Sequence, residues 1–202
     1  MHDREKLKAR ARQAIRKSAA LGPDLDLDSF DTAATRHDYL NDEQLVRLPA
    51  SERQRLVMAG LDLTQEERGG TYFQMDTAVV HCGSRQDGVE VLPIRQALER
   101  HDWIQDYYWR LVAVDSDKYT AAAELELHDG YVIRSLPGTK SIYPVQACLY
   151  LDKENLRQNV HNIIIAEEDS ELHIITGCST SSHLKRGAHV GVSEFFIKKN
   201  AK

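Results

Sequence analysis

The chain has 202 residues, of which 42% are hydrophobic and 28% are charged, a composition typical of a globular protein with one large or two small domains. Its formal net charge is −5, yet residues 1–20 carry seven Lys or Arg against two acidic residues, which leaves −10 on the remainder. This acidic body argues against nucleic acid as a partner, because phosphate contacts need clustered cations on a folded face. The sequence has no apolar run long enough to cross a bilayer and no signal-peptide hydrophobic region, so we expect a cytoplasmic protein with no membrane partner.

The three cysteines are Cys82, Cys148 and Cys178. They are odd in number, widely separated and without a CxxC pair, so they indicate neither a disulfide framework nor a standard structural zinc site. We expect three reduced thiols.

The first half of the chain favours helices. Residues 5–21 form a basic amphipathic pattern closed by Gly22 and Pro23, and its thin, alanine-rich stripe favours a solvated or loosely docked helix over a membrane-surface helix. Residues 51–60 predict a short capped helix. Residues 93–111 predict another, whose aromatic side chains at helical spacing indicate core packing rather than a platform for bases or a flavin.

Strands are predicted where β-branched and aromatic runs lie between turn residues, namely at residues 71–82, 89–92, 124–128, 131–135 and 145–151. The change from helices to strands places a boundary near residues 111–120.

The last quarter, residues 159–202, consists of short strands separated by charged or small-residue turns. Two of these strands end alike, because Asp169 and Asn200 each precede a small residue and then a charge. The same corner used twice suggests a β-solenoid, in which each coil buries its inner face against the neighbouring coils. The chain stops at Lys202 on such a corner, so we expect it to be the N-terminal part of a longer protein or a truncated relative.

Several segments recur in an order that is familiar from one family. An acidic turn from Glu167 to Ser170 is followed by Gly177-Cys178-Ser179, and Ala188-His189-Val190 then leads to Glu194 and the next strand. Upstream lie Tyr72-Phe73-Gln74-Met75-Asp76 and Asp117-Lys118-Tyr119-Thr120-Ala121. From about Leu48 onward the chain therefore resembles the SufB/SufD family, the scaffold proteins of the SUF iron–sulfur cluster assembly system.

The strand pattern and the resemblance together predict an α+β fold. A mostly helical N-terminal region is expected to precede the first coils of a right-handed parallel β-helix, which is a β-solenoid. The expected domains are residues 1–115, mixed and mainly helical, and residues 116–202, the start of the β-helix core, which we expect to continue beyond the chain end.

Cys178 is the candidate catalytic residue, as a sulfur acceptor. A thiol after Gly177, with small hydroxyl residues beside it and Lys185 and Arg186 nearby in sequence, has the setting of a partly exposed thiolate, although most free cysteines are inert and buried. In the resembled family, the cysteine at this Gly-Cys position is implicated in sulfur uptake and transfer along the solenoid interior. The alternation of polar and apolar residues along 172–178 is ambiguous, so it does not show whether Cys178 faces that interior.

Four other residues bear on the expected function. The family's arginine and asparagine before the acidic turn correspond here to Tyr150 and Asp152, which favours a SufD-like, non-catalytic role over a SufB-like one. His189 is a candidate metal ligand, although a lone histidine on a strand is more often structural. Glu194, if it points inward, needs a partner such as Lys185 or Arg186.

The resemblance implies a scaffold in iron–sulfur cluster assembly that is not itself an enzyme. It implies a SufC-type ABC ATPase, a SufB/SufD-like solenoid or a second copy of this chain, and sulfur-donor proteins as partners. A transient iron–sulfur cluster is the implied cofactor, and whether a flavin takes part stays open. The alternatives are a solenoid interaction module that binds no iron or sulfur and, ranked last, a carbohydrate-active β-helix enzyme, which would need paired carboxylates across a cleft.

Overall fold

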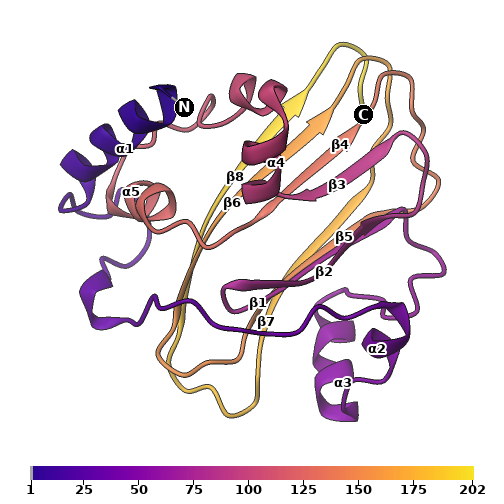
Figure 1. Ribbon diagram of the computed structural model, residues 1–202, viewed down its shortest axis with the longest axis horizontal. Coiled ribbons are helices and arrows are strands. Elements are labelled where there is room, and N and C mark those ends of the chain that lie inside the picture. The colour runs from indigo at the N-terminus through magenta and orange to yellow at the C-terminus, as the bar shows by residue number, and fades with distance from the viewer. Residues whose placement is uncertain (1) are drawn as a thin grey trace.

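The computed structural model describes residues 2–202 as a mixed α/β structure built on two four-stranded sheets (Figure 1). The helices are α1 (His2–Ala14), η1 (Leu27–Ser29), α2 (Asp42–Val46), α3 (Ala50–Met58), α4 (Ile94–Arg100), η2 (Asp102–Asp106) and α5 (Lys118–Leu125). The strands are β1 (Gly70–Met75), β2 (Ala78–Ser84), β3 (Val89–Pro93), β4 (Tyr131–Ser135), β5 (Val145–Leu151), β6 (Arg157–Ala166), β7 (Ile174–Thr180) and β8 (Ala188–Ile197).

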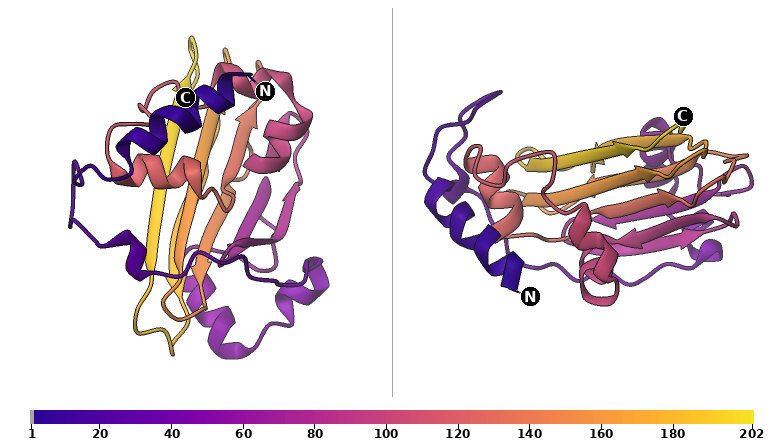
Figure 2. Two further views of the ribbon diagram at one scale, coloured as in Figure 1. Left: turned by 60° about the vertical axis from the view of Figure 1, so that its left-hand side comes forward. Right: turned by 90° about the horizontal axis from the view of Figure 1, so that it is seen from above.

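The two sheets have the strand orders β2-β1-β5-β7 and β3-β4-β6-β8. In each sheet one pair is antiparallel, β1 with β2 and β3 with β4, and the remaining neighbours are parallel. Strands β7 and β8 are therefore the last strands of the two sheets, at the same side of the molecule (Figure 2).

The predicted β-helix is wrong, and so is the mostly helical N-terminal region. The chain forms two mixed sheets, and three strands, β1, β2 and β3, lie within the first 115 residues. The corner that suggested a solenoid is nevertheless real. Asp169 and Asn200 both adopt left-handed backbone, with φ of 59° and 57°, and the Asn200 amide donates to the Asp169 carboxylate at 2.8 Å. A repeated corner of this kind requires only two parallel strands in register, and a mixed sheet supplies them.

Apolar side chains fill the space between the sheets. The inner faces contribute Tyr72, Ile133, Ala147, Leu149 and Ile164 to one buried cluster. Every residue of the central strands β5 and β6 is buried, because both faces of these strands are covered. Strand β8 instead alternates between buried and exposed residues, so one of its faces is left uncovered.

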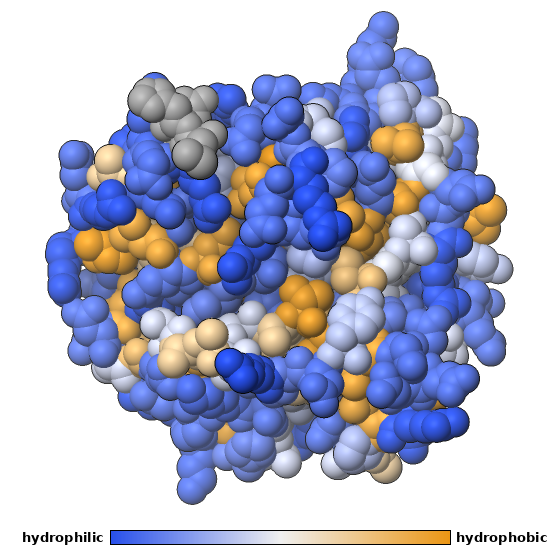
Figure 3. Space-filling model, viewed as in Figure 1, coloured by the Kyte–Doolittle hydropathy of each residue, from blue (hydrophilic) through white to orange (hydrophobic). Residues whose placement is uncertain are grey.

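Helices cover the outer faces of both sheets. The cluster outside β4, β6 and β8 includes side chains of α1, α4 and α5, and Figure 2 shows α1 lying against α5. Helices α2 and α3 pack outside β1 and β5, where Leu45 and Leu56 contact the face that carries Phe73 and Cys148. Between the apolar patches, the view in Figure 3 is mainly hydrophilic. None of the helices among residues 2–202 is long and apolar enough to span a membrane.

Several predicted elements have different bounds in the structure. The helix expected at residues 5–21 ends at Ala14, and the one expected at 93–111 is divided into α4 and η2. The strand expected at 71–82 is the hairpin of β1 and β2, whose turn contains Asp76 with a φ of 51°. The strand expected at 124–128 is wrong, because residues 118–125 form α5, whose first turn Asp117 and Thr120 hold in a capping box.

Candidate functional site between the last strands of the two sheets

Cys178 lies on β7, the last strand of its sheet, and its side chain points toward the other sheet. It stands in register with Leu149, whose side chain belongs to the core between the sheets, and parallel neighbours in register share a face. No further strand pairs with the free edge of β7, and Cys178 is exposed. Partial burial raises the pKa of its thiol.

Gly177 explains why the thiol is held on this face. A Cβ atom on Gly177 would lie 1.9 Å from the carbonyl oxygen of Ala59, at the end of α3 on the outer face of the sheet. Only glycine permits this approach, and Gly60 beside it has a left-handed φ of 90°. The Gly-Cys pair therefore packs one face of β7 tightly against the α3 end and presents the thiol on the opposite face.

His189 lies on β8, beside Gln158 of β6. Its Nδ1 is 2.9 Å from the amide oxygen of Gln158, while the Gln158 amide nitrogen donates to the carbonyl oxygen of Asp76 at 2.5 Å. Because the Gln158 oxygen can only accept, Nδ1 carries the proton and Nε2 carries the lone pair. His189 is exposed by its surface area, but the surrounding protein atoms partly desolvate the ring and lower its pKa to about 4, so the imidazole is neutral at physiological pH.

The two candidate residues line one cavity of about 350 Å³ between the sheets. The chain leaves β7 at Thr180, two residues after Cys178, and re-enters a strand at Ala188, one residue before His189. This connection brings both side chains to the same end of the space between the sheets. The other lining residues are small, apolar or neutral polar: Tyr131, Ala147, Leu149, Asn162, Thr176, Gly177, Gly191 and Ser193.

The remaining thiols lie in different surroundings. Cys82 is on β2, at the far edge of the same sheet, and its Sγ is 3.4 Å from the carbonyl oxygen of Val91. Cys148 is buried on the outer face, under α2 and α3. Burial raises the pKa of each of these two thiols to about 12. Cys178 is thus the thiol that a reagent or a partner can reach.

Glu194 does not pair with Lys185 or Arg186. It lies on the outer face of β8, buried, and its carboxylate contacts the Nε2 of His161 at 2.8 Å. It also accepts hydrogen bonds from the backbone N–H groups of Trp109 and Val112, at 2.9 and 3.0 Å. The carboxylate thereby fixes the loop after η2, a structural role that sequence proximity did not reveal.

Tyr150 and Asp152 lie away from the cavity. The Tyr150 ring packs on the outer face against Phe73, at 6.4 Å between ring centroids. Asp152 follows β5, with its carboxylate 3.9 Å from His183. Neither residue is among those that line the space containing Cys178.

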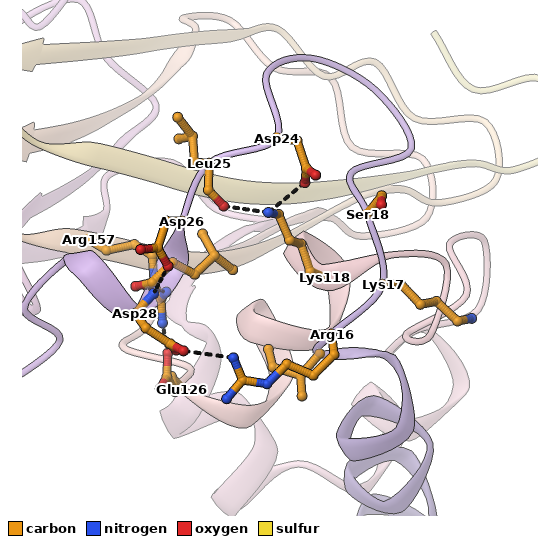
Figure 4. A pocket seen from close by; sticks show the side chains of 12 residues that line it. Arg16, Lys17, Ser18, Asp24, Leu25, Asp26, Asp28, Lys118, Glu126 and Arg157 are labelled. Atoms are coloured by element: carbon orange, nitrogen blue, oxygen red, sulfur yellow. Dashed lines mark hydrogen bonds and ion pairs between the residues drawn. The ribbon is translucent and has the colours of Figure 1, made fainter.

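A second hollow, of about 210 Å³, lies where the segment after α1 meets α5 (Figure 4). Six of its charged lining residues form three ion pairs. Lys118 contacts Asp24 at 2.5 Å, Arg16 contacts Asp28 at 2.7 Å, and the buried Arg157 pairs with Glu126. Lys118 holds Asp24, and Arg157 also donates to the carbonyl oxygen of Leu27 at 2.7 Å, so these two side chains anchor residues 24–28 to the body of the molecule. Among residues 4–202, whose side chains the structure describes, no group of three or more His, Cys, Asp or Glu side chains is arranged to hold a metal ion.

Comparison with known proteins agrees with these sequence features. The chain is 42% identical over 198 residues to an iron–sulfur cluster assembly SufBD family protein of Methanothermobacter thermautotrophicus (strain Winter), an alignment of 96% of the chain and 48% of that protein. A SufBD family protein of Archaeoglobus fulgidus is 50% identical over 151 residues, which are 75% of the chain and 40% of that protein. SufB of Bacillus subtilis is 24% identical over 88% of the chain and 40% of that protein. No protein-family model matches.

These relatives define the class of protein: components of iron–sulfur cluster assembly. The chain belongs to the SufBD family. It spans about half the length of the curated relatives that it matches most strongly.

Proposed function

We propose that this chain is part of a scaffold on which iron–sulfur clusters are assembled, and that sulfur enters at Cys178. The observation that carries the proposal is the placement of the three thiols: Cys178 is exposed in a cavity between the sheets, whereas Cys82 and Cys148 are largely enclosed. The names of the relatives support the wider role.

The step at Cys178 is a transfer of sulfane sulfur from a donor persulfide. The Cys178 thiolate attacks the outer sulfur of the donor, an S–S bond forms at Cys178, and the donor's S–S bond breaks. The donor thiolate leaves and takes up the proton that Cys178 lost, so no external oxidant or reductant is consumed. Because partial burial raises the pKa of Cys178, the thiolate is a minor form at neutral pH and a bound donor must help to deprotonate it.

We further propose that the chain is not itself an enzyme and works with an ABC-type ATPase. Residues 83–88 form a glycine-bounded turn without the Gly-Lys-Ser/Thr ending of a phosphate-binding loop, which supports ATP hydrolysis by a partner. A related chain or a second copy of this one, together with sulfur-donor proteins, completes the proposed set of partners. Co-purification of a tagged chain from its own cells, followed by mass spectrometry, tests this set.

Persulfide labelling tests the role of Cys178. The purified chain is incubated with a cysteine desulfurase and its sulfur carrier, and tryptic peptides are then weighed. We expect the mass of one added sulfur atom on the Cys178 peptide, loss of this label in Cys178→Ser, and retention of it in the matched control Cys82→Ser. Equal labelling of the three cysteines, or no labelling, would remove the sulfur-uptake role.

One observation favours a second candidate, an interaction module that binds no sulfur or iron. The edge strand β8 exposes apolar side chains at its end, with Phe195 50% and Ile197 59% exposed, and a free strand edge can pair with another strand. Under this alternative, Cys178→Ser leaves complex formation unchanged and the wild-type chain takes up no label.

A further inference from the structure

Two buried carboxylates hold the loop after η2. Glu194 accepts hydrogen bonds from the backbone N–H groups of Leu111 and Val112. Glu124 accepts a hydrogen bond from the indole N–H of Trp109 at 2.9 Å. Trp109 adopts left-handed backbone, with a φ of 55°, which is a strained conformation for a bulky residue. The surrounding structure thus imposes a strained conformation on this loop, and strain of this kind is concentrated at functional sites.

The loop presents Arg110 and Leu111 to solvent. The Nε and Nη2 atoms of Arg110 both donate to the backbone carbonyl oxygen of Gln105, at 3.2 and 3.0 Å, which fixes the orientation of the guanidinium. These bonds use only part of its N–H donors, so the others remain available to a ligand. Among residues 4–202, Arg110 has no carboxylate partner. Leu111 is 60% exposed, so the loop places an oriented cation and an apolar side chain next to each other.

The N-terminal part of α1 lies beside this loop. Together with η2 they form a hollow of about 300 Å³, whose lining residues are Lys6, Leu7, Arg10, Gln105, Tyr108, Trp109 and Arg110. The charged side chains of this lining are all cations. Arg10 forms an ion pair with Asp115 at 2.5 Å. Because Arg110 has no such partner among the described side chains, the lining keeps uncompensated positive charge, on a chain whose residues 21–202 carry a net charge of −10.

From this arrangement we propose that the hollow and Leu111 form a docking surface for an acidic segment of a partner protein, in which carboxylates flank an apolar side chain. One carboxylate accepts two parallel hydrogen bonds from Arg110, the bidentate pairing that favours arginine at carboxylate sites. A second carboxylate is attracted to the basic α1, and the apolar side chain packs on Leu111. The proposal goes beyond the proposed function, because it uses neither Cys178 nor the cavity between the sheets.

The surroundings of the hollow argue against two other anionic partners. A nucleic-acid base needs an aromatic face on which to stack, but the rings of Tyr108 and Trp109 are buried. A membrane-surface helix needs an apolar stripe that faces lipid, but Ala11 and Ala14 of α1 are fully buried in the core cluster, where α1 packs against α5. An acidic protein segment requires neither feature, because it needs only cations and a small apolar contact.

Fluorescence anisotropy with the labelled peptide Glu-Glu-Leu-Glu-Glu tests the surface. We expect saturable binding that weakens as salt is added, because exposed charges are screened. Arg110→Glu should weaken binding about tenfold or more, the loss expected when a hydrogen bond between charged groups is removed. Arg110→Lys should keep part of the affinity, since it retains the charge without the bidentate geometry. Leu111→Ser should remove the preference for this peptide over Glu-Glu-Ser-Glu-Glu.

Arg12→Glu is the matched control. Arg12 is exposed on α1 but does not line the hollow, so the variant makes the same change of charge and should lose far less affinity than Arg110→Glu. Circular dichroism of each variant establishes that it is folded. Lack of saturable binding, an affinity unchanged in Arg110→Glu, or equal losses in Arg12→Glu and Arg110→Glu would overturn the proposal. Tighter binding of a single-stranded oligonucleotide or of phosphatidylserine vesicles than of the peptide, lost in Arg110→Glu, would overturn it as well, because the surface would then serve another class of partner.

Discussion

Two histidines on adjacent strands of one sheet show a closed polar site and an open one. His161 on β6 faces the helix-covered side, with 0% of its side chain exposed, and its Nε2 contacts Glu194 at 2.8 Å. The rings of Trp109 and Tyr108 pack against it, with centroids 4.3 and 4.8 Å away. His189 on β8 faces the other side, is exposed, and lines the cavity between the sheets.

The contrast arises from which face of the sheet each histidine occupies. On the outer face, the loop after η2 folds over the strands. The Glu194 carboxylate accepts hydrogen bonds from the backbone N–H groups of Trp109, Leu111 and Val112 in this loop. Trp109 in this loop has a left-handed φ of 55°, a conformation that needs such external support. On the inner face, Gln158 is the one described residue whose side chain forms a hydrogen bond with the His189 imidazole. The closed site stabilises the fold, whereas the open side leaves His189 exposed at the cavity that Cys178 also lines.

The largest expected effect is on the closed site. Glu194→Ala should lower the free energy of unfolding by about 3–5 kcal/mol, because it leaves His161 and the loop N–H groups buried without their acceptor. Urea denaturation followed by tryptophan fluorescence measures this loss. The isosteric control Glu194→Gln keeps one acceptor oxygen and should lose less. A loss below about 1 kcal/mol for Glu194→Ala would show that the carboxylate does not hold the loop.

A smaller loss of stability is expected where β7 packs against the end of α3. Gly177→Ala places a Cβ 1.9 Å from the Ala59 carbonyl oxygen, so β7 and the end of α3 must separate. Overpacking of this kind costs about 1–3 kcal/mol. Gly83→Ala on β2 is the matched control, because its Cβ would meet nothing within 4 Å. Thermal unfolding of both variants makes the comparison, and equal melting temperatures would refute the tight contact of α3 with β7.

The sequence predicted local features of the strands better than their assembly. Residues 131–135 and 145–151 are strands with the predicted bounds, because runs of apolar residues between turns identify buried strands. The alternation of apolar and polar residues in 71–82 concealed the hairpin turn at Asp76, because the same alternation continues on both sides of the turn. The solenoid was inferred from one repeated corner together with the family resemblance, and a mixed sheet with parallel neighbours produces the same corner.

The candidate site was predicted in part. Cys178 and His189 were identified from residue type and resemblance, and the structure places both at one cavity. Gln158 was missed, although a signal existed: Asp169 and Asn200 are 31 residues apart, and the same offset from His189 gives Gln158. The backbone N–H groups that donate to Glu194 belong to Trp109 and Val112, more than 80 positions away, and no local pattern encodes such a pairing.

The finest test of the contrast between the two histidines is the tautomer and pKa of His189. Imidazolium is disfavoured when the ring is buried, so the pKa of His189 lies at about 4, below the ordinary value of about 6.5 for histidine. We therefore expect ¹⁵N NMR of the imidazoles to show His189 neutral, with the proton on Nδ1, from neutral pH down to about 4, where it gains its second proton. Gln158→Leu removes the acceptor that fixes Nδ1–H, so it should give a mixture of the two neutral tautomers. Titration of wild-type His189 near pH 6.5 would mean that the protein does not desolvate the ring, and the same tautomer in Gln158→Leu would mean that Gln158 does not orient it.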